Sequence, residues 1–226
     1  INGVVDQLRR YGHEVELIRF PFRFSPEAEV QRVMDFCEGS DLSMPNGVSV
    51  DKVISLQFPA YGVQHPDHRV WIMHQHRAVY ELHADQPASA ELDQLKQSVT
   101  EFDNRVLGRA QHLYANSQRV AQRLQQYNGL QAEPLYHPPF GAEKFFTDDA
   151  YDYIFAPSRL ESLKRQDLLI RAARYLHSPV KILLAGTGGQ EQRYRRLIAE
   201  MGVEERVQLV GGFSEAEKHV FYARCL

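Results

Sequence analysis

The fold is decided by residues 151–190, which read YDYIFAPSRLESLKRQDLLIRAARYLHSPVKILLAGTGGQ. The apolar runs 151–156 and 180–185 predict two buried strands, and the segment 163–177 between them has the spacing of a helix. The same alternation continues to the end of the chain, with further elements expected at 190–201, at 206–210 and from Ser214 onward, where Glu217 completes a capping box. Strands that alternate with helices predict βαβ units and a parallel sheet.

The first half of the chain repeats this alternation. Helices are expected at 2–11, 26–38, 88–107 and 116–127, and strands at 13–20, 51–56, 69–73, 112–115 and 133–136. One face of the helix 88–107 is apolar, which indicates a core stripe. A polar connection around Thr147 divides the two runs of elements. The sequence therefore predicts an α/β protein with two Rossmann-like parallel-sheet domains, 1–146 and 147–226, that face a cleft.

Composition excludes several classes of protein. The 226 residues include 26 basic and 29 acidic side chains, and the net charge of −3 argues against a nucleic-acid binder. No run of about 18 apolar residues is present, which excludes a spanning helix. The two cysteines, Cys37 and Cys225, make neither a disulfide framework nor a tetrahedral zinc site, and this favours a reducing, cytoplasmic location.

A basic loop follows the expected strand 151–156. Arg159, Lys164 and Arg165 crowd the predicted start of a helix, where the partial positive charge of the helix disfavours cations. Basic side chains at this position are explained if an anion such as a diphosphate binds between them and the free backbone N–H groups. The alternative is a set of solvated cations paired with Glu161 and Asp167.

Two glycine-rich loops follow the next two expected strands. Gly186, Gly188 and Gly189 open one helix, and Gly211-Gly212-Phe213 precedes another. Glycines allow a backbone to approach a ligand closely. A tight strand-to-helix turn is the alternative, and it explains the Gly186 loop better when that loop is considered alone. Because ligands of parallel sheets bind outside the carboxyl ends of the strands, the three loops are expected to converge on one pocket.

Two histidines follow the expected strand 69–73. The spacing of His74 and His76 suits a metal pair, but no third ligand accompanies them, and no metal is expected. His74 lies just past a strand end, where it can hydrogen-bond near reacting sugar or phosphate oxygens; a packing role is the alternative. His65, His68 and His83 are expected in loops or at the surface.

Several motifs together resemble a known family. They are Ser158-Arg159-Leu160 with Lys164 and the segment 167–170, then Gly186-Thr187-Gly188, Gly212-Phe213-Ser214, the segment 114–120 (YANSQRV) and the segment 8–15 (LRRYGHEV). In this order they resemble GT-B glycosyltransferases of family 4, the glycogen-synthase-like type. Ser158 stands where that family usually has Gly, and Gly189 stands where it usually has Pro.

The resemblance implies a retaining transfer of sugar from a nucleotide-sugar, such as a UDP- or GDP-sugar, to a saccharide or lipid-linked acceptor. Arg159 and Lys164 would bind the donor diphosphate, and backbone near Gly186, Gly188 and Phe213 would face the nucleotide. His74 would lie near the sugar as the catalytic residue. Such enzymes need no metal and no further cofactor, because cations and helix N-termini stabilise the leaving diphosphate.

Parts of the family pattern are expected beyond both ends of this chain. The first strand with its Gly-Gly loop would precede Ile1, and a Glu-x7-Glu segment would follow Leu226. Both domains are therefore expected to be incomplete and the transferase activity to be low or absent. The alternatives are a non-hydrolysing sugar-nucleotide epimerase and a nucleotide-binding relative without catalysis.

Basic residues near the start of the chain suggest a peripheral contact with the inner membrane face. They are Arg9, Arg10, Arg19 and Arg23. A few such side chains bind an anionic surface only loosely, at about 1 kcal/mol each, so a solvated basic face is the alternative.

Overall fold

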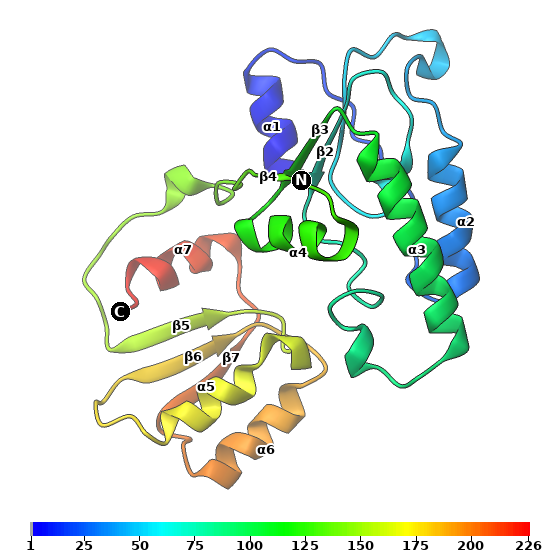
Figure 1. The fold of residues 1–226 in the computed structure, drawn as a ribbon. Helices are drawn as coiled ribbons and strands as arrows, with labels where there is room; N and C mark the ends of the chain where they lie inside the picture. Colours follow the sequence, from blue (N-terminus) through cyan, green and yellow to red (C-terminus); the bar gives the residue numbers. More distant parts are fainter. Residues whose placement is uncertain (1) are drawn as a thin grey trace. The chain divides into compact units, whose positions relative to one another are not determined.

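The computed structural model describes residues 2–226 and divides the chain into two compact units. Unit 1 ends at Pro138 and unit 2 is Pro139–Leu226. Each unit has its own parallel sheet with helices, which confirms the predicted fold class (Figure 1). The boundary predicted after residue 146 lies inside unit 2, in the segment that leads to its first strand.

Unit 1 is built on a four-stranded parallel sheet with the order β1-β2-β3-β4. The strands are β1 (Val53–Ser55), β2 (His68–Ile72), β3 (His112–Ala115) and β4 (Glu133–Pro134). The helices are α1 (Asn2–Arg10), α2 (Glu27–Glu38), α3 (Ala90–Gly108) and α4 (Gln118–Asn128), and 3-10 turns lie at Pro45–Gly47, Ala60–Gly62 and His83–Asp85. Consecutive strands are thus neighbours in the sheet.

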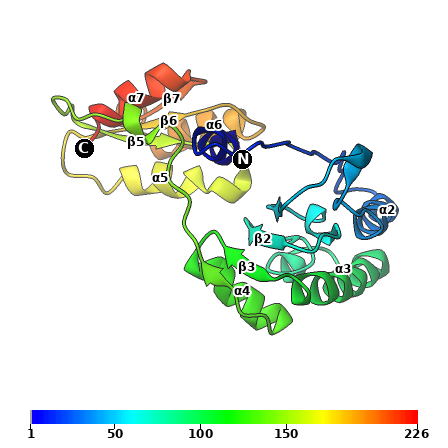
Figure 2. The same ribbon diagram turned by 90° about the horizontal axis from the view of Figure 1, so that it is seen from above.

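The core of unit 1 is organised around α3. The hydroxyl of Ser89 caps this helix by accepting from the Leu92 N–H. The predicted apolar stripe is confirmed, since Leu95, Val99 and Phe102 are buried and pack into the main core cluster. Helices α2 and α3 lie side by side (Figure 1, Figure 2).

The strand predicted at 13–20 is wrong. Residues 13–20 form neither helix nor strand, and among the described residues no strand pairs with them. Their alternating side chains are exposed or half-buried. A strand needs a neighbour for its backbone N–H and C=O groups, and the alternating pattern alone does not supply one.

Two of the four basic residues near the start of the chain form hydrogen bonds within the same segment. The Arg9 guanidinium donates to the Val15 carbonyl at 2.7 Å, and that of Arg19 donates to the Asn2 side chain at 3.3 Å. Helix α1 has no buried residue. Over residues 2–226, no helix combines the length and apolar character needed to cross a bilayer.

Unit 2 has a three-stranded parallel sheet with the order β5-β6-β7. The elements are β5 (Tyr153–Pro157), α5 (Gln166–Ala173), β6 (Lys181–Ala185), α6 (Glu191–Met201), β7 (Val207–Gly211) and α7 (Glu215–Ala223), with 3-10 turns at Ala142–Lys144 and Ser162–Lys164. Helix α5 lies on one side of the sheet and α7 on the other (Figure 2). On the α7 side, Phe155 stacks on Phe221 with ring centroids 4.8 Å apart.

Two helix predictions in unit 2 have different outcomes. The capping box of α7 is confirmed, because the Ser214 hydroxyl accepts from the Glu217 N–H while the Glu217 carboxylate accepts from the Ser214 N–H. The helix expected at 163–177 is too long, since α5 covers only 166–173. Arg165 adopts the left-handed conformation with φ of 54° and separates α5 from the preceding 3-10 turn.

Candidate functional site

Three loops meet at the carboxyl edge of the β5-β6-β7 sheet. The Ser158 N–H donates to the Ala185 carbonyl at 2.8 Å, and the Leu160 N–H donates to the Thr187 carbonyl at 2.9 Å. The Gly186 N–H donates to the Gly211 carbonyl at 2.6 Å. The loop after β5 is therefore bonded to the loop after β6, and the loop after β6 is bonded to the last residue of β7.

Two glycines of the middle loop are required by this close approach. Gly186 has φ of +136°, and a Cβ on it would lie 2.1 Å from the Ser158 carbonyl oxygen. A Cβ on Gly188 would lie 2.5 Å from the Leu160 carbonyl oxygen, whereas one on Gly189 would meet nothing within 4 Å. These two glycines leave room for the backbone of the basic loop, and this close contact explains their presence without a ligand.

The cations of the basic loop have acidic neighbours. Arg159 pairs with Glu161 at 2.8 Å, and Arg165 pairs with Asp167 at 3.1 Å. The Arg165 guanidinium lowers the pKa of the Asp167 carboxyl. The predicted alternative of Glu161 and Asp167 as partners is thus present for two of the three cations. Lys164 is exposed in the 3-10 turn.

Two buried side chains hold the backbone of the basic loop, and neither was predicted from the sequence to do so. The buried Gln166 amide donates to the Arg159 carbonyl at 2.9 Å. The hydroxyl of Tyr194, a fully buried residue of α6, lies 3.1 Å from Gln166 Oε1 and 3.3 Å from the Glu161 carbonyl oxygen. Tyr194 falls on the apolar face of α6 with Leu197, so its helical spacing signals burial but not its hydrogen bonds.

Phe213 lies in the third loop and is held by an aromatic contact. Its ring is half-buried and meets the edge of Phe155, with centroids 5.8 Å apart. Gly212, beside it, has room for a Cβ at 3.7 Å from the Thr187 methyl group. The aromatic contact holds the loop after β7 against β5.

In unit 1, His74 and His76 occupy different surroundings. His74 is exposed, and its Nδ1 lies 2.8 Å from the Gln75 carbonyl oxygen. His76 is buried, with its ring 5.0 Å from Phe58 and 5.5 Å from Phe24, and neither ring nitrogen has a partner in the described part of the chain. Within residues 2–226, no three His, Cys, Asp or Glu side chains form a group that would hold a metal ion.

The bond to Gln75 indicates the tautomer of the neutral His74 ring. A carbonyl oxygen only accepts, so Nδ1 carries the hydrogen and donates it. Nε2 of the neutral ring then keeps its lone pair and accepts a hydrogen bond or a proton. His74 therefore presents an acceptor nitrogen just beyond the carboxyl end of β2.

The surface location expected for His68 is wrong. His68 opens β2, is 4% exposed, and has its Nε2 2.9 Å from the Ser55 hydroxyl. Burial lowers the pKa of its ring to about 4. The alternation of β2 places this residue on the same face as Val70 and Ile72, both of which are buried.

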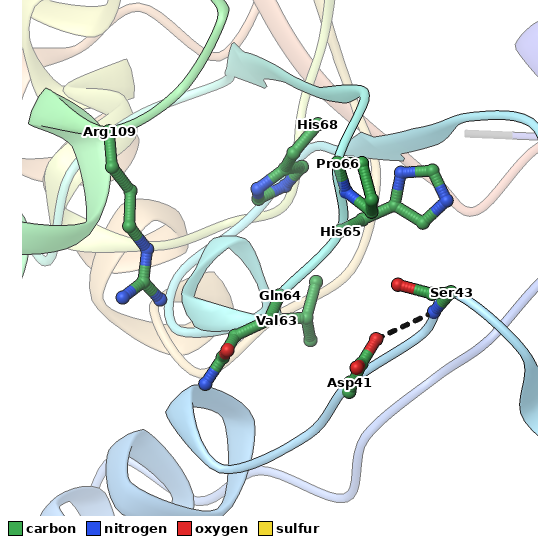
Figure 3. Close-up of a pocket in the computed structure, with 8 residues that line it drawn as sticks. All are labelled: Asp41, Ser43, Val63, Gln64, His65, Pro66, His68 and Arg109. Atoms are coloured by element: carbon green, nitrogen blue, oxygen red, sulfur yellow. Dashed lines mark hydrogen bonds between the residues drawn. The ribbon is translucent and has the colours of Figure 1, made fainter.

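A separate cavity of about 350 Å³ lies at the amino end of β2 (Figure 3). Its lining residues are Asp41, Ser43, Val63, Gln64, His65, Pro66, His68 and Arg109. The Arg109 guanidinium already donates to the Gly62 carbonyl at 2.7 Å and pairs with Glu38. None of the predicted site residues lines this cavity, and His74 follows the opposite end of the strand.

Comparison with protein families finds a match that lies within unit 2. Residues 142–226 match the model of the family Glycosyl transferases group 1. This region contains all three loops of the carboxyl edge, including Arg159, Lys164 and the glycines after β6. A search of curated proteins finds no significant match to the chain.

Solved glycosyltransferase structures share the fold over nearly the whole chain. A sucrose-phosphate synthase from Thermosynechococcus elongatus matches with a TM-score of 0.64 and 15% identity, over 93% of this chain and 57% of its own. Anabaena HepE in complex with UDP and glucose matches with a TM-score of 0.55 and 18% identity, over 97% of this chain and 61% of its own. A glycosyltransferase from Rickettsia africae matches with a TM-score of 0.53 and 14% identity, over 98% of this chain and 60% of its own.

These likenesses show the predicted GT-B fold. The chain spans about three fifths of the length of these three structures.

Proposed function

We propose that unit 2 binds the diphosphate of a nucleotide-sugar and that the chain forms part of a retaining glycosyltransferase. The observation that carries the proposal is the coincidence of two features. The family match covers residues 142–226, and within them the loop after β5, which is bonded to the loop after β6, presents Arg159 and Lys164 at the carboxyl edge of a parallel sheet. The acceptor we propose is a saccharide or a lipid-linked sugar.

The proposed role of Arg159 depends on its exchange of partners. The side chain of Arg159 is 74% exposed and that of Glu161 is 40% exposed, so their ion pair contributes at most about 1 kcal/mol. A diphosphate carries more charge than a carboxylate and accepts two parallel hydrogen bonds from a guanidinium. Arg159 therefore exchanges Glu161 for the ligand at little cost.

The anchoring of the loop supports the same role. Gln166 and Tyr194 hold the backbone of residues 159–161, while the Arg159 side chain stays exposed. A charged group on a fixed backbone loses less conformational freedom when it binds a ligand. Developing charge on the leaving diphosphate is then stabilised by cations that are already in place.

For His74 we propose a hydrogen bond from a sugar hydroxyl to Nε2. The ring presents this nitrogen as an acceptor because Nδ1 donates to the Gln75 carbonyl. A hydroxyl donor is matched in chemistry to a neutral imidazole nitrogen. No covalent step is assigned to His74.

Calorimetric titration of the full chain with UDP and with GDP tests the diphosphate site. Arg159→Ala and Lys164→Ala are each expected to weaken binding by about 10-fold or more, because hydrogen bonds to charged groups contribute about 1.5–3 kcal/mol. Arg174→Ala, which removes an exposed cation at the other end of α5, is the matched control and leaves the affinity unchanged.

Unchanged affinity in both loop variants, or no binding of either nucleotide, contradicts the proposal. Nucleotide binding with no sugar transfer from any donor by the complete protein favours the non-catalytic relative instead. Formation of an epimerised sugar-nucleotide favours the epimerase.

A further inference from the structure

A buried chain of hydrogen bonds runs through unit 1 and begins at Asp103. This carboxylate of α3 is fully buried. The Tyr61 hydroxyl donates to Oδ1 at 2.6 Å, and the Tyr80 hydroxyl donates to Oδ2 at 2.8 Å. While Asp103 is ionised, each carboxylate oxygen thus has its own donor, and the Tyr80 hydrogen is committed to Asp103.

This commitment sets the direction of the next two bonds. Because the Tyr80 oxygen has given its hydrogen to Asp103, it acts as an acceptor for the Asn128 amide at 3.1 Å. The same amide nitrogen also donates to Asn104 at 2.7 Å, so the Asn128 oxygen is left to accept. That oxygen accepts from the side-chain amide of Gln75.

Gln75 is the end of the chain of bonds and the neighbour of His74. It is 2% exposed, and its Oε1 has no partner among the described residues. Its backbone carbonyl is the group that receives the hydrogen from His74 Nδ1. The side chain of Gln75 is therefore fixed from inside the core while its backbone orients the ring outside.

We propose that Gln75 and Asn128 are positioning residues, which hold the Gln75 carbonyl where it keeps His74 in its Nδ1–H form with Nε2 available to substrate. The significance for catalysis rests on the proposed function of His74, but the effect on the ring does not. Neither residue touches substrate. Asn128 is the last residue of α4, far from His74 in sequence, and it acts only through Gln75.

A simple structural role for these residues predicts a different result from the one we expect. If the amides only fill space and satisfy one another, their removal lowers stability and leaves the His74 ring unchanged. If they position the carbonyl, their removal releases His74 Nδ1 and the ring exchanges between its two neutral forms. The protonation of a single ring separates the two cases.

The experiment is ¹H–¹⁵N spectroscopy of the histidine rings in the full chain at a pH where His74 is neutral. The His74 signals are assigned by their loss in His74→Gln. The wild type is expected to show mainly the Nδ1–H form. In Gln75→Leu and in Asn128→Ala the ratio of the Nδ1–H to the Nε2–H form is expected to fall severalfold.

The matched control is Val33→Ala, which removes core methyl groups from α2 in a cluster separate from that of Tyr61 and Tyr80, and leaves the His74 ratio unchanged. Should Gln75→Leu fail to fold, Asn128→Ala carries the test, since Asn128 is only half-buried. An unchanged ratio in a folded variant, or an Nε2–H form in the wild type, overturns the inference. A failure of nucleotide binding overturns the proposed function and leaves this result intact.

Discussion

Gly186→Ala is expected to destabilise unit 2 by about 3 kcal/mol. At a φ of +136° a residue with a side chain carries strain of about 1–3 kcal/mol. The new Cβ would lie 2.1 Å from the Ser158 carbonyl oxygen, and real Cβ atoms do not approach within 3.0 Å, so the two loops must separate. That movement breaks the bond from Ser158 N–H to Ala185, a loss of about 1 kcal/mol.

The measurement is urea unfolding of the full chain, followed separately for each unit. The single tryptophan, Trp71, lies in β2 and reports unit 1, whereas amide hydrogen exchange of the β6 strand reports unit 2. Gly189→Ala is the matched control, because its Cβ meets nothing within 4 Å. The control is expected to change the free energy of unfolding by less than about 0.5 kcal/mol.

Equal protection of β6 in Gly186→Ala and Gly189→Ala would refute the reasoning, because the loops would then not be interlocked. Loss of Trp71 fluorescence at a lower urea concentration would also contradict it, since the clash lies wholly within unit 2. The expected result is a shift confined to unit 2.

Burial raises the pKa of Asp103 to about 7, so unit 1 of the wild type is expected to lose stability on the order of 4 kcal/mol as the pH rises from about 4 to about 7. Asp103→Asn is expected to remove this pH dependence. Burial lowers the pKa of His68 to about 4, so the wild type is expected to lose stability on the order of 3 kcal/mol as the pH falls from 6.5 to about 4, and His68→Gln is expected to remove this loss. Urea unfolding at a series of pH values measures both effects. Tyr194→Phe is expected to cost unit 2 about 1–2 kcal/mol by unpairing a buried amide, whereas the exposed Tyr175→Phe costs nothing measurable, as followed by thermal unfolding. Ser214→Ala is expected to cost about 1 kcal/mol and to speed amide exchange in the first turn of α7; exchange as slow as in the wild type would contradict the capping box.

Elements with a strong local signal were predictable from the sequence. The strands β5, β6 and β7 are apolar runs between helical patterns, and α3 shows a continuous apolar stripe. The start of α7 is encoded within four residues by its capping box. In each case the residues that form the element also contain the information that specifies it.

Features that depend on distant partners were not predictable. Residues 13–20 alternate like a strand, but no neighbouring strand in the described chain pairs with them. Arg165 interrupts the predicted helix just before α5 because of its left-handed backbone conformation, which its residue type does not signal. The burial of His68 depends on Ser55 of the neighbouring strand, and pairings between strands are not readable from one segment.

The candidate site likewise has features that the sequence predicts and features that depend on distant partners. Its location at the ends of β5, β6 and β7 follows from the order of strands and helices, and the exposed Arg159 and Lys164 were recognisable by their charge. A close backbone approach at the glycines was predictable, but its partner was not, since the carbonyl group that Gly186 accommodates belongs to Ser158 in another loop. The anchors Gln166 and Tyr194 were invisible, because a polar side chain gives no sequence signal of the bond it makes.

The backbone bonds that join the loops after β5 and β6 to each other and to the end of β7 have a consequence for how this edge of the sheet changes in evolution and on binding. A loop joined to its neighbours by main-chain bonds cannot shift without carrying them along. Adaptation to a different donor is therefore expected through exchanged or rotated side chains on a constant frame, and insertions should be tolerated only outside the bonded residues.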